Sequence, residues 1–168
     1  MSRNGLSQAF DQVIQEAAEK DSVLRFRRQG STHRVIEQDC AGLIEFQKST
    51  TNSADQIRFT INLAVVCRAL LNPDQSSLEK ARSPEAHLRL RIGMLLPGRP
   101  DKWWEIKDGV NVAELAGEVS TLIATEAAPY VTRYLDRGEL ISLWRSGESP
   151  GLTETQRLRY LEQLSRGL

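Results

Sequence analysis

Alternation of apolar and polar side chains in two neighbouring runs most constrains how this chain folds. In residues 57–63 four large apolar side chains alternate with three polar ones, and residues 43–49 place Ile44 and Phe46 on one face and Glu45, Gln47 and Ser49 on the other. Successive side chains of a strand point to opposite faces, so both runs predict strands with one apolar and one polar face. The short polar break between them, residues 50–55, favours antiparallel pairing.

Two adjacent tryptophans extend this sidedness to a further strand. Residues 102–106 predict a strand with Trp104 in the core and Trp103 on the polar face. Residues 87–92 alternate in the same way, with Leu and Ile on one face and His and Arg on the other. Residues 24–36, with a turn at Gly30, add two short strands, and their cluster of arginines is interpreted as a solvated strand edge.

The hydrophobic period becomes helical at both ends of the sheet region. Apolar residues at three- and four-residue spacing in 6–17 predict an amphipathic N-terminal helix. A longer stripe in residues 112–134 predicts a helix that packs on the apolar face of the sheet, with Asn111 as its N-cap. Pro129 lies inside this stripe and is expected to kink or split the helix.

The C-terminal region predicts one or two short helices. Residues 139–145 form the first candidate, and Thr153 with Gln156 forms a capping box at the start of the second. An N-terminal helix, an antiparallel sheet of about four to five strands and then helices give the α+β class. We expect a single domain over residues 1–168, with a core in 6–135 and a helical extension in 139–168.

Composition narrows the possible functions. The chain of 168 residues has 22 basic and 22 acidic side chains, a balance that argues against binding nucleic acid through its phosphates. The sequence shows no signal peptide and no apolar run of the roughly 18–20 residues that cross a bilayer, so we expect a cytoplasmic protein. Its oligomeric state, monomer or dimer, stays open.

Cysteine and histidine are too scarce for a conventional zinc site. Cys40 and Cys67 are far apart in the sequence, and we interpret them as small core residues rather than as a disulfide. The sequence contains no P-loop and no glycine-rich dinucleotide motif. We therefore predict no metal and no cofactor.

Four motifs occur in one order and at consistent gaps: residues 46–49, 59–63, 87–93 and 102–106. Together they resemble the domain-of-unknown-function family 4304, a group of small and mostly bacterial proteins. The resemblance covers roughly residues 6–135. It implies an α+β fold and implies no activity, cofactor or catalytic residue.

The polar face of the predicted sheet is the candidate site. Arginine and histidine beside an aromatic ring suit an anionic or planar ligand. The candidate residues are Gln47, Ser49, Arg58, Asn62, His87, Arg89, Arg91, Trp103 and Glu105. The alternative interpretation of the same pattern is a solvated face with cross-strand salt bridges.

Two classes of function are compatible with this face. The first is a non-catalytic binding or protein-interaction module whose partner is a protein or a small anionic ligand. The second is a small hydrolase or transferase in which His87 acts with a carboxylate, although no nucleophile motif accompanies it. We expect the binding module, and we assign no catalytic residue.

Overall fold

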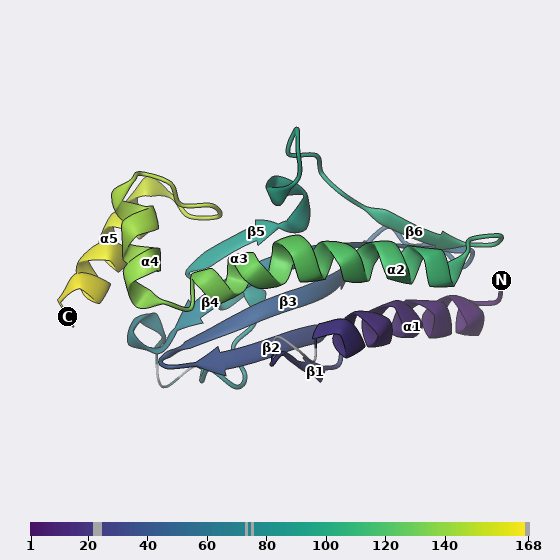
Figure 1. Ribbon diagram of the computed structural model, residues 1–168, viewed down its shortest axis with the longest axis horizontal. Helices are drawn as coiled ribbons and strands as arrows, with labels where there is room; N and C mark the ends of the chain where they lie inside the picture. Colours follow the sequence, from purple (N-terminus) through teal and green to yellow (C-terminus); the bar gives the residue numbers. More distant parts are fainter. Residues whose placement is uncertain (22–24, 73, 75, 167–168) are drawn as a thin grey trace.

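The computed structural model describes residues 1–21, 25–72, 74 and 76–166, and it shows an α+β fold, as predicted (Figure 1). The elements are, in chain order, α1 (Arg3–Asp21), β1 (Arg27–Gln29), β2 (Thr32–Glu37), β3 (Cys40–Lys48), β4 (Gln56–Cys67), the 3-10 turns η2 (Arg68–Leu70) and η3 (Ser83–Glu85), β5 (Leu88–Arg91), the 3-10 turn η4 (Ile92–Leu95), β6 (Trp104–Lys107), α2 (Val112–Leu122), the π-helical turn η5 (Ile123–Ala127), α3 (Ala128–Arg133), α4 (Arg137–Arg145) and α5 (Glu154–Ser165). The first predicted strand began at residue 24, which lies outside the described residues.

In the described part of the chain, six strands form one antiparallel sheet. Strands β1 to β4 follow one another as a meander, and β5 and β6 both pair with β4. β5 pairs with residues 62–65 of β4 and β6 with residues 56–59, so the two short strands lie end to end along one edge of β4. The connection between them leaves the sheet in a loop.

One helical layer covers one face of the sheet. α1 lies beside the run of α2, η5 and α3, and both cross the same face (Figure 1). Trp104 is buried there and stacks on Phe59 at 5.4 Å between ring centroids, while Phe10 of α1 meets Phe59 edge-on. The predicted division of the tryptophan pair is confirmed, because Trp103 is only half-buried and lies on the other face.

Pro129 divides the long helix by a π-helical turn rather than by a break. A proline has no N–H to donate, and its ring clashes with the carbonyl four residues earlier in a regular helix. The preceding turn widens, and the Ala128 N–H donates to the Ile123 carbonyl five residues back. The helix continues through α3, and the apolar side chains of α2 and of α3 both face the sheet. The predicted N-cap is also present, since Asn111 Oδ1 accepts from the Glu114 N–H at 3.2 Å.

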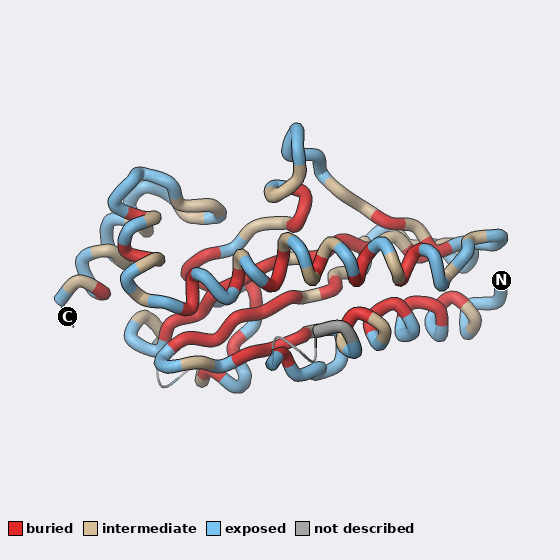
Figure 2. The backbone as a smooth tube through the Cα atoms, in the orientation of Figure 1, coloured by how far each residue is buried: buried red, intermediate tan, exposed pale blue. Residues whose placement is uncertain are grey.

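Part of the second face of the sheet, the one opposite the helices, is also buried. Residues 76–86, here called the covering segment, lie across it. Their apolar side chains and those of the strands form a second small core: Ala41, Leu43, Ala64, Val66, Leu78, Ala81 and Ala86. From the sequence, residues 72–85 are expected to form a polar loop with a helical turn at its centre, which either covers the polar face or leaves it open. Burial is continuous over residues 40–44 of β3 and 63–67 of β4, and Figure 2 shows the central strands as mostly buried.

Cys40 and Cys67 form a disulfide, which corrects the prediction that they are unlinked core residues. They are register partners at the ends of β3 and β4, with Cα atoms 4.2 Å apart, and both are buried. Pairing across strands brings together residues that are 27 positions apart in the chain. Sequence spacing alone does not reveal that register.

The C-terminal helices pack at the end of the sheet where β4 finishes. The predicted capping box is present, with Gln156 accepting from the Thr153 N–H at 2.9 Å. Trp144 of α4 is fully buried against Tyr160 of α5. The last two residues of the predicted extension lie outside the described residues. Among the helices that are described, none is long and apolar enough to span a membrane.

Candidate functional site

The covering segment leaves two open surfaces on the second face of the sheet. The register places one row of side chains across all the strands from β5 to β1: Arg89, Ala64, Leu43, Arg34 and Arg27. Because directly opposed side chains share a face, this row has an arginine at either end and an apolar middle. The covering segment lies on that middle, so an arginine-bearing surface stays open on each side of it.

The surface beside β5 contains a hollow of about 380 Å³, here called the mixed hollow. Its lining residues are Glu45, Gln47, Asn62, Ser83, Pro84, Arg89, Leu90 and Arg91. Four of the predicted site residues are therefore brought together. Glu45, Leu90, Ser83 and Pro84 are additional, and the last two come from the covering segment.

The floor of the mixed hollow is a hydrogen-bonded amide pair. Asn62 Nδ2 donates to Gln47 Oε1 at 2.7 Å, which leaves the Nε2 donors of Gln47 and the Oδ1 acceptor of Asn62 for a ligand. Beside them the Ser83 hydroxyl donates to Glu45 Oε2 at 2.8 Å and fixes that carboxylate. The floor thus presents donors and acceptors close together.

Arg89 supplies the free positive charge of the mixed hollow. Within the described residues its guanidinium pairs with no carboxylate, and its Nε makes only a long 3.4 Å contact to the Gly151 carbonyl. Gly151 packs so tightly on the Arg89 stem that a Cβ at that position would lie 2.4 Å from Arg89 Cγ. The C-terminal region therefore restrains the stem while the charge stays exposed.

Arg91 belongs both to the mixed hollow and to a neighbouring group around Trp103, here called the Trp103 cluster. The guanidinium groups of Arg91 and Arg58 lie 5.1 and 5.5 Å from the Trp103 ring centroid. Arg91 also pairs with Asp101 at 2.7 Å, and Arg58 with Glu105 at 3.4 Å. The ring holds the protein's own cations and is not a free stacking platform for a ligand.

Asp101 is the residue of the Trp103 cluster that the sequence reasoning did not select. Its carboxylate accepts from Trp103 Nε1 at 3.0 Å and from Arg91. The hydrogen bond from Trp103, followed by that from Arg91, lowers the pKa of Asp101 below its usual value. Its position two residues before Trp103 was the available signal, because i and i+2 side chains of an extended segment share a face.

Two predicted residues lie outside both groups. Ser49 hydrogen-bonds with Thr51 in the exposed turn after β3. His87 was expected on the polar face with Arg89, and this is wrong. It precedes β5 and is buried under the C-terminal helices, where its ring contacts Tyr160 at 5.0 Å.

The environment of His87 keeps it neutral. Burial lowers the pKa of His87 to about 4, and its Nδ1 accepts the Cys67 backbone N–H at 3.0 Å. A ring that is 3% exposed and already engaged by the backbone has no free nitrogen lone pair to offer a substrate as a base. His87 therefore has a structural role: it links the end of β4 to the C-terminal helices.

Comparison with known proteins identifies one relationship. A family model described as "Domain of unknown function (DUF4304)" matches residues 23–133. This range begins after α1 and is shorter than the 6–135 expected from the motifs. No curated protein and no solved structure matches the chain.

Proposed function

We propose a function from the geometry of the mixed hollow. The chain belongs to the DUF4304 family, and the domain that defines this family is one of unknown function. The protein is a non-catalytic binding module. The mixed hollow binds a small ligand that carries a carboxylate next to a hydrogen-bonding polar group, such as the carboxyl end of an amino acid or a short peptide.

The observation that carries this proposal is the position of Arg89 beside fixed donors and acceptors. A guanidinium without a carboxylate partner binds a ligand carboxylate through two parallel hydrogen bonds. The amide groups of Gln47 and Asn62 match a peptide or amide group, and Glu45 accepts from an ammonium or N–H. A volume of about 380 Å³ is within the range of small-molecule sites.

The enzyme alternative loses its principal residue. A hydrolase based on His87 needs an accessible imidazole near a nucleophile. His87 is buried against Tyr160, and Ser49 is in a distant turn whose hydroxyl is bonded to Thr51. The binding module needs neither residue.

Calorimetric titration with amino acids and dipeptides tests the proposal. Each ligand is paired with its C-terminal amide, which differs only in lacking the carboxylate. We expect the acid to bind and its amide to bind at least tenfold more weakly. Arg89→Gln is expected to weaken binding of the acid by roughly ten- to a hundredfold, because it removes a charge-assisted hydrogen bond.

The matched control is Arg27→Gln, which removes the same charge at the other end of the same row. It should leave binding of the acid unchanged. The proposal would be contradicted if acids and amides bound equally well, or if no acid bound. It would also be contradicted if Arg89→Gln and Arg27→Gln weakened binding of the acid equally.

A further inference from the structure

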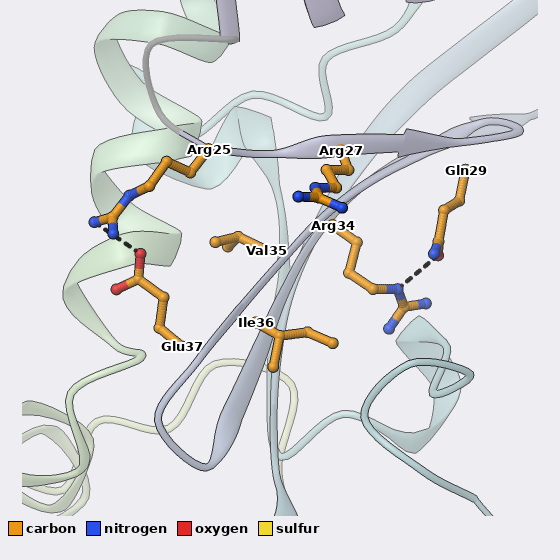
Figure 3. A pocket seen from close by; sticks show the side chains of 7 residues that line it. All are labelled: Arg25, Arg27, Gln29, Arg34, Val35, Ile36 and Glu37. Carbon is orange, nitrogen blue, oxygen red and sulfur yellow. Dashed lines mark hydrogen bonds and ion pairs between the residues drawn. The ribbon is translucent and has the colours of Figure 1, made fainter.

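The second open surface lies on the far side of the covering segment, at the β1–β2 edge. It is a pocket of about 400 Å³, here called the arginine groove. Its lining residues are Arg25, Arg27, Gln29, Arg34, Val35, Ile36 and Glu37. In Figure 3 the Arg25–Glu37 pair stands at one end, the Arg34–Gln29 pair at the other, and Arg27 between them. From the sequence, these arginines are expected at a solvated strand edge.

Two like charges face each other in the arginine groove. Arg27 and Arg34 are register partners on β1 and β2, so their side chains leave the sheet on the same face. Like charges in directly opposed positions destabilise a strand pair. In the part of the chain that the structure describes, neither guanidinium forms an ion pair, and the side chain of Arg27 makes no hydrogen bond.

Arg34 is held in place even though its charge is costly there. It is only 8% exposed, and its guanidinium donates to the carbonyls of Leu78 and Ala81 at 2.5 and 2.7 Å. Burial lowers the pKa of Arg34, and the nearby carboxylates of Glu79, Glu45 and Glu85 only partly oppose this effect. The two carbonyls and the fields of these carboxylates stabilise the cation, but none of the three carboxylates lines the groove or pairs with Arg34, so the guanidinium keeps its positive charge there.

Gln29 adds donors of fixed direction. Its Oε1 accepts from Arg34 Nε at 2.8 Å, so its Nε2 is turned outward as a donor. The Arg27 guanidinium contributes five more N–H groups. The part of the groove around Arg27 therefore consists of hydrogen-bond donors, in contrast to the mixed hollow.

Charge and apolar surface define the ligand further. Arg25 pairs with Glu37 at 3.0 Å, so three guanidinium groups and one carboxylate leave two positive charges. Ile36 is 40% exposed on the same side of β2 as Arg34 and provides an apolar patch. A matching ligand carries two negative charges, accepts from several directions and has an apolar part.

We propose that the arginine groove is a binding site for a phosphate monoester dianion, with Arg27, Arg34 and Gln29 around the phosphate and Ile36 against the organic group. A phosphate accepts hydrogen bonds in several directions, whereas one guanidinium fork saturates a planar carboxylate. Bound phosphate relieves the repulsion between Arg27 and Arg34.

Thermal melting with inorganic phosphate and phenyl phosphate tests this proposal on the full chain. Both should raise the melting temperature, and phenyl phosphate should bind more tightly because its ring covers Ile36. Arg27→Gln should abolish both responses. Arg145→Gln is the matched control, since Arg145 is exposed at the end of α4 and has no partner among the described residues; it should keep both responses.

A second readout separates a ligand site from a purely structural role. Without phosphate, Arg27→Gln should melt at a temperature equal to or above that of the wild type, because the like-charge pair is gone. With phosphate, the wild type should melt above the variant.

No response of the wild type to either phosphate, or equal losses in Arg27→Gln and Arg145→Gln, would overturn the site. A lower melting temperature of Arg27→Gln without phosphate would overturn the repulsion on which it rests. Equal affinity for the two phosphates would overturn the role of Ile36. Arg89→Gln should leave phosphate binding intact, so this proposal and the carboxylate proposal fail independently.

Discussion

The two arginine surfaces lie on one face of one sheet, yet they handle positive charge differently. Around the mixed hollow, Arg91 and Arg58 each have a carboxylate, Asp101 or Glu105, and share the Trp103 ring. In the arginine groove, Arg27 and Arg34 oppose each other and, within the described residues, neither forms an ion pair, although Glu79, Glu45 and Glu85 act on Arg34 from a longer distance. One row of opposed side chains runs from Arg89 at the first surface to Arg34 and Arg27 at the second. The two ends of this row carry the same kind of charge, and they differ in the groups that surround it.

This difference shows how the environment of a charged residue indicates its role. Where partners are complete, as for Arg58 and Arg91, the arginine stabilises the fold and positions its neighbours. Where like charges oppose each other without an ion pair, as for Arg27 and Arg34, the pairing preference of a sheet is broken, and such exceptions are typical of functional sites. Arg89, free but unopposed, lies between these extremes and suits a single carboxylate.

The largest expected effect comes from removing the buried charge of the arginine groove. Arg34→Met leaves the carbonyls of Leu78 and Ala81 without donors and detaches the covering segment, at a cost of about 4 kcal/mol in the free energy of unfolding. Arg91→Met, at a half-exposed pair with Asp101, should cost about 1 kcal/mol. Urea denaturation measures both, and equal costs would remove the contrast between the surfaces.

Lowering the pH should reduce the free energy of unfolding through His87, which is buried just before β5. The pKa of His87, about 4, is below its unfolded value, so the folded state resists protonation. Stability from this residue is complete above the unfolded pKa of about 6.5 and falls as the pH drops toward 4. Between pH 7 and pH 5 we expect a loss of about 2 kcal/mol in the free energy of unfolding.

His87→Gln is the control for this loss. Its side-chain carbonyl can still accept from the Cys67 N–H, but it does not titrate. Urea denaturation at the two pH values should show a smaller difference in this variant. An unchanged difference would mean that another group causes the acid response.

The smallest expected effect concerns the Trp103 cluster. Trp103→Phe keeps a ring beside Arg58 and Arg91 but removes the Nε1 donor to Asp101. The pKa of Asp101 should rise toward its usual value, because this hydrogen bond is the main cause of its lowering. The stability that the lowered pKa provides would then be lost at a higher pH as acid is added. Carboxyl carbon NMR follows the titration, and an unmoved pKa would assign the lowering to Arg91 instead.

The alternation of residues 43–49 and 57–63 predicted the sheet and its two faces correctly, because burial of one face leaves a period of two in the sequence. The same reasoning placed Trp103 and Trp104. It gave strands that were too short at β3 and β4. The apolar runs 40–44 and 63–67 do not alternate, which is the signature of strands buried on both faces and was the signal for the covering segment.

The remaining features depend on register and on distant packing. The Cys40–Cys67 disulfide and the opposition of Arg27 and Arg34 appear only when strands are paired residue by residue. The alternation of residues 87–92 misplaced His87, because the C-terminal helices bury that end of the sheet. The cytoplasmic location stays a prediction, since disulfides are more typical of oxidising compartments.

The most direct test of the contrast between the two surfaces is an NMR titration of the arginine side-chain N–H signals. Phenyl phosphate should move the signals of Arg27 and Arg34, and a dipeptide added afterwards should move those of Arg89 and Arg91. Each ligand should leave the other pair in place. Movement of both pairs by either ligand, or of neither pair by both ligands, would contradict the account.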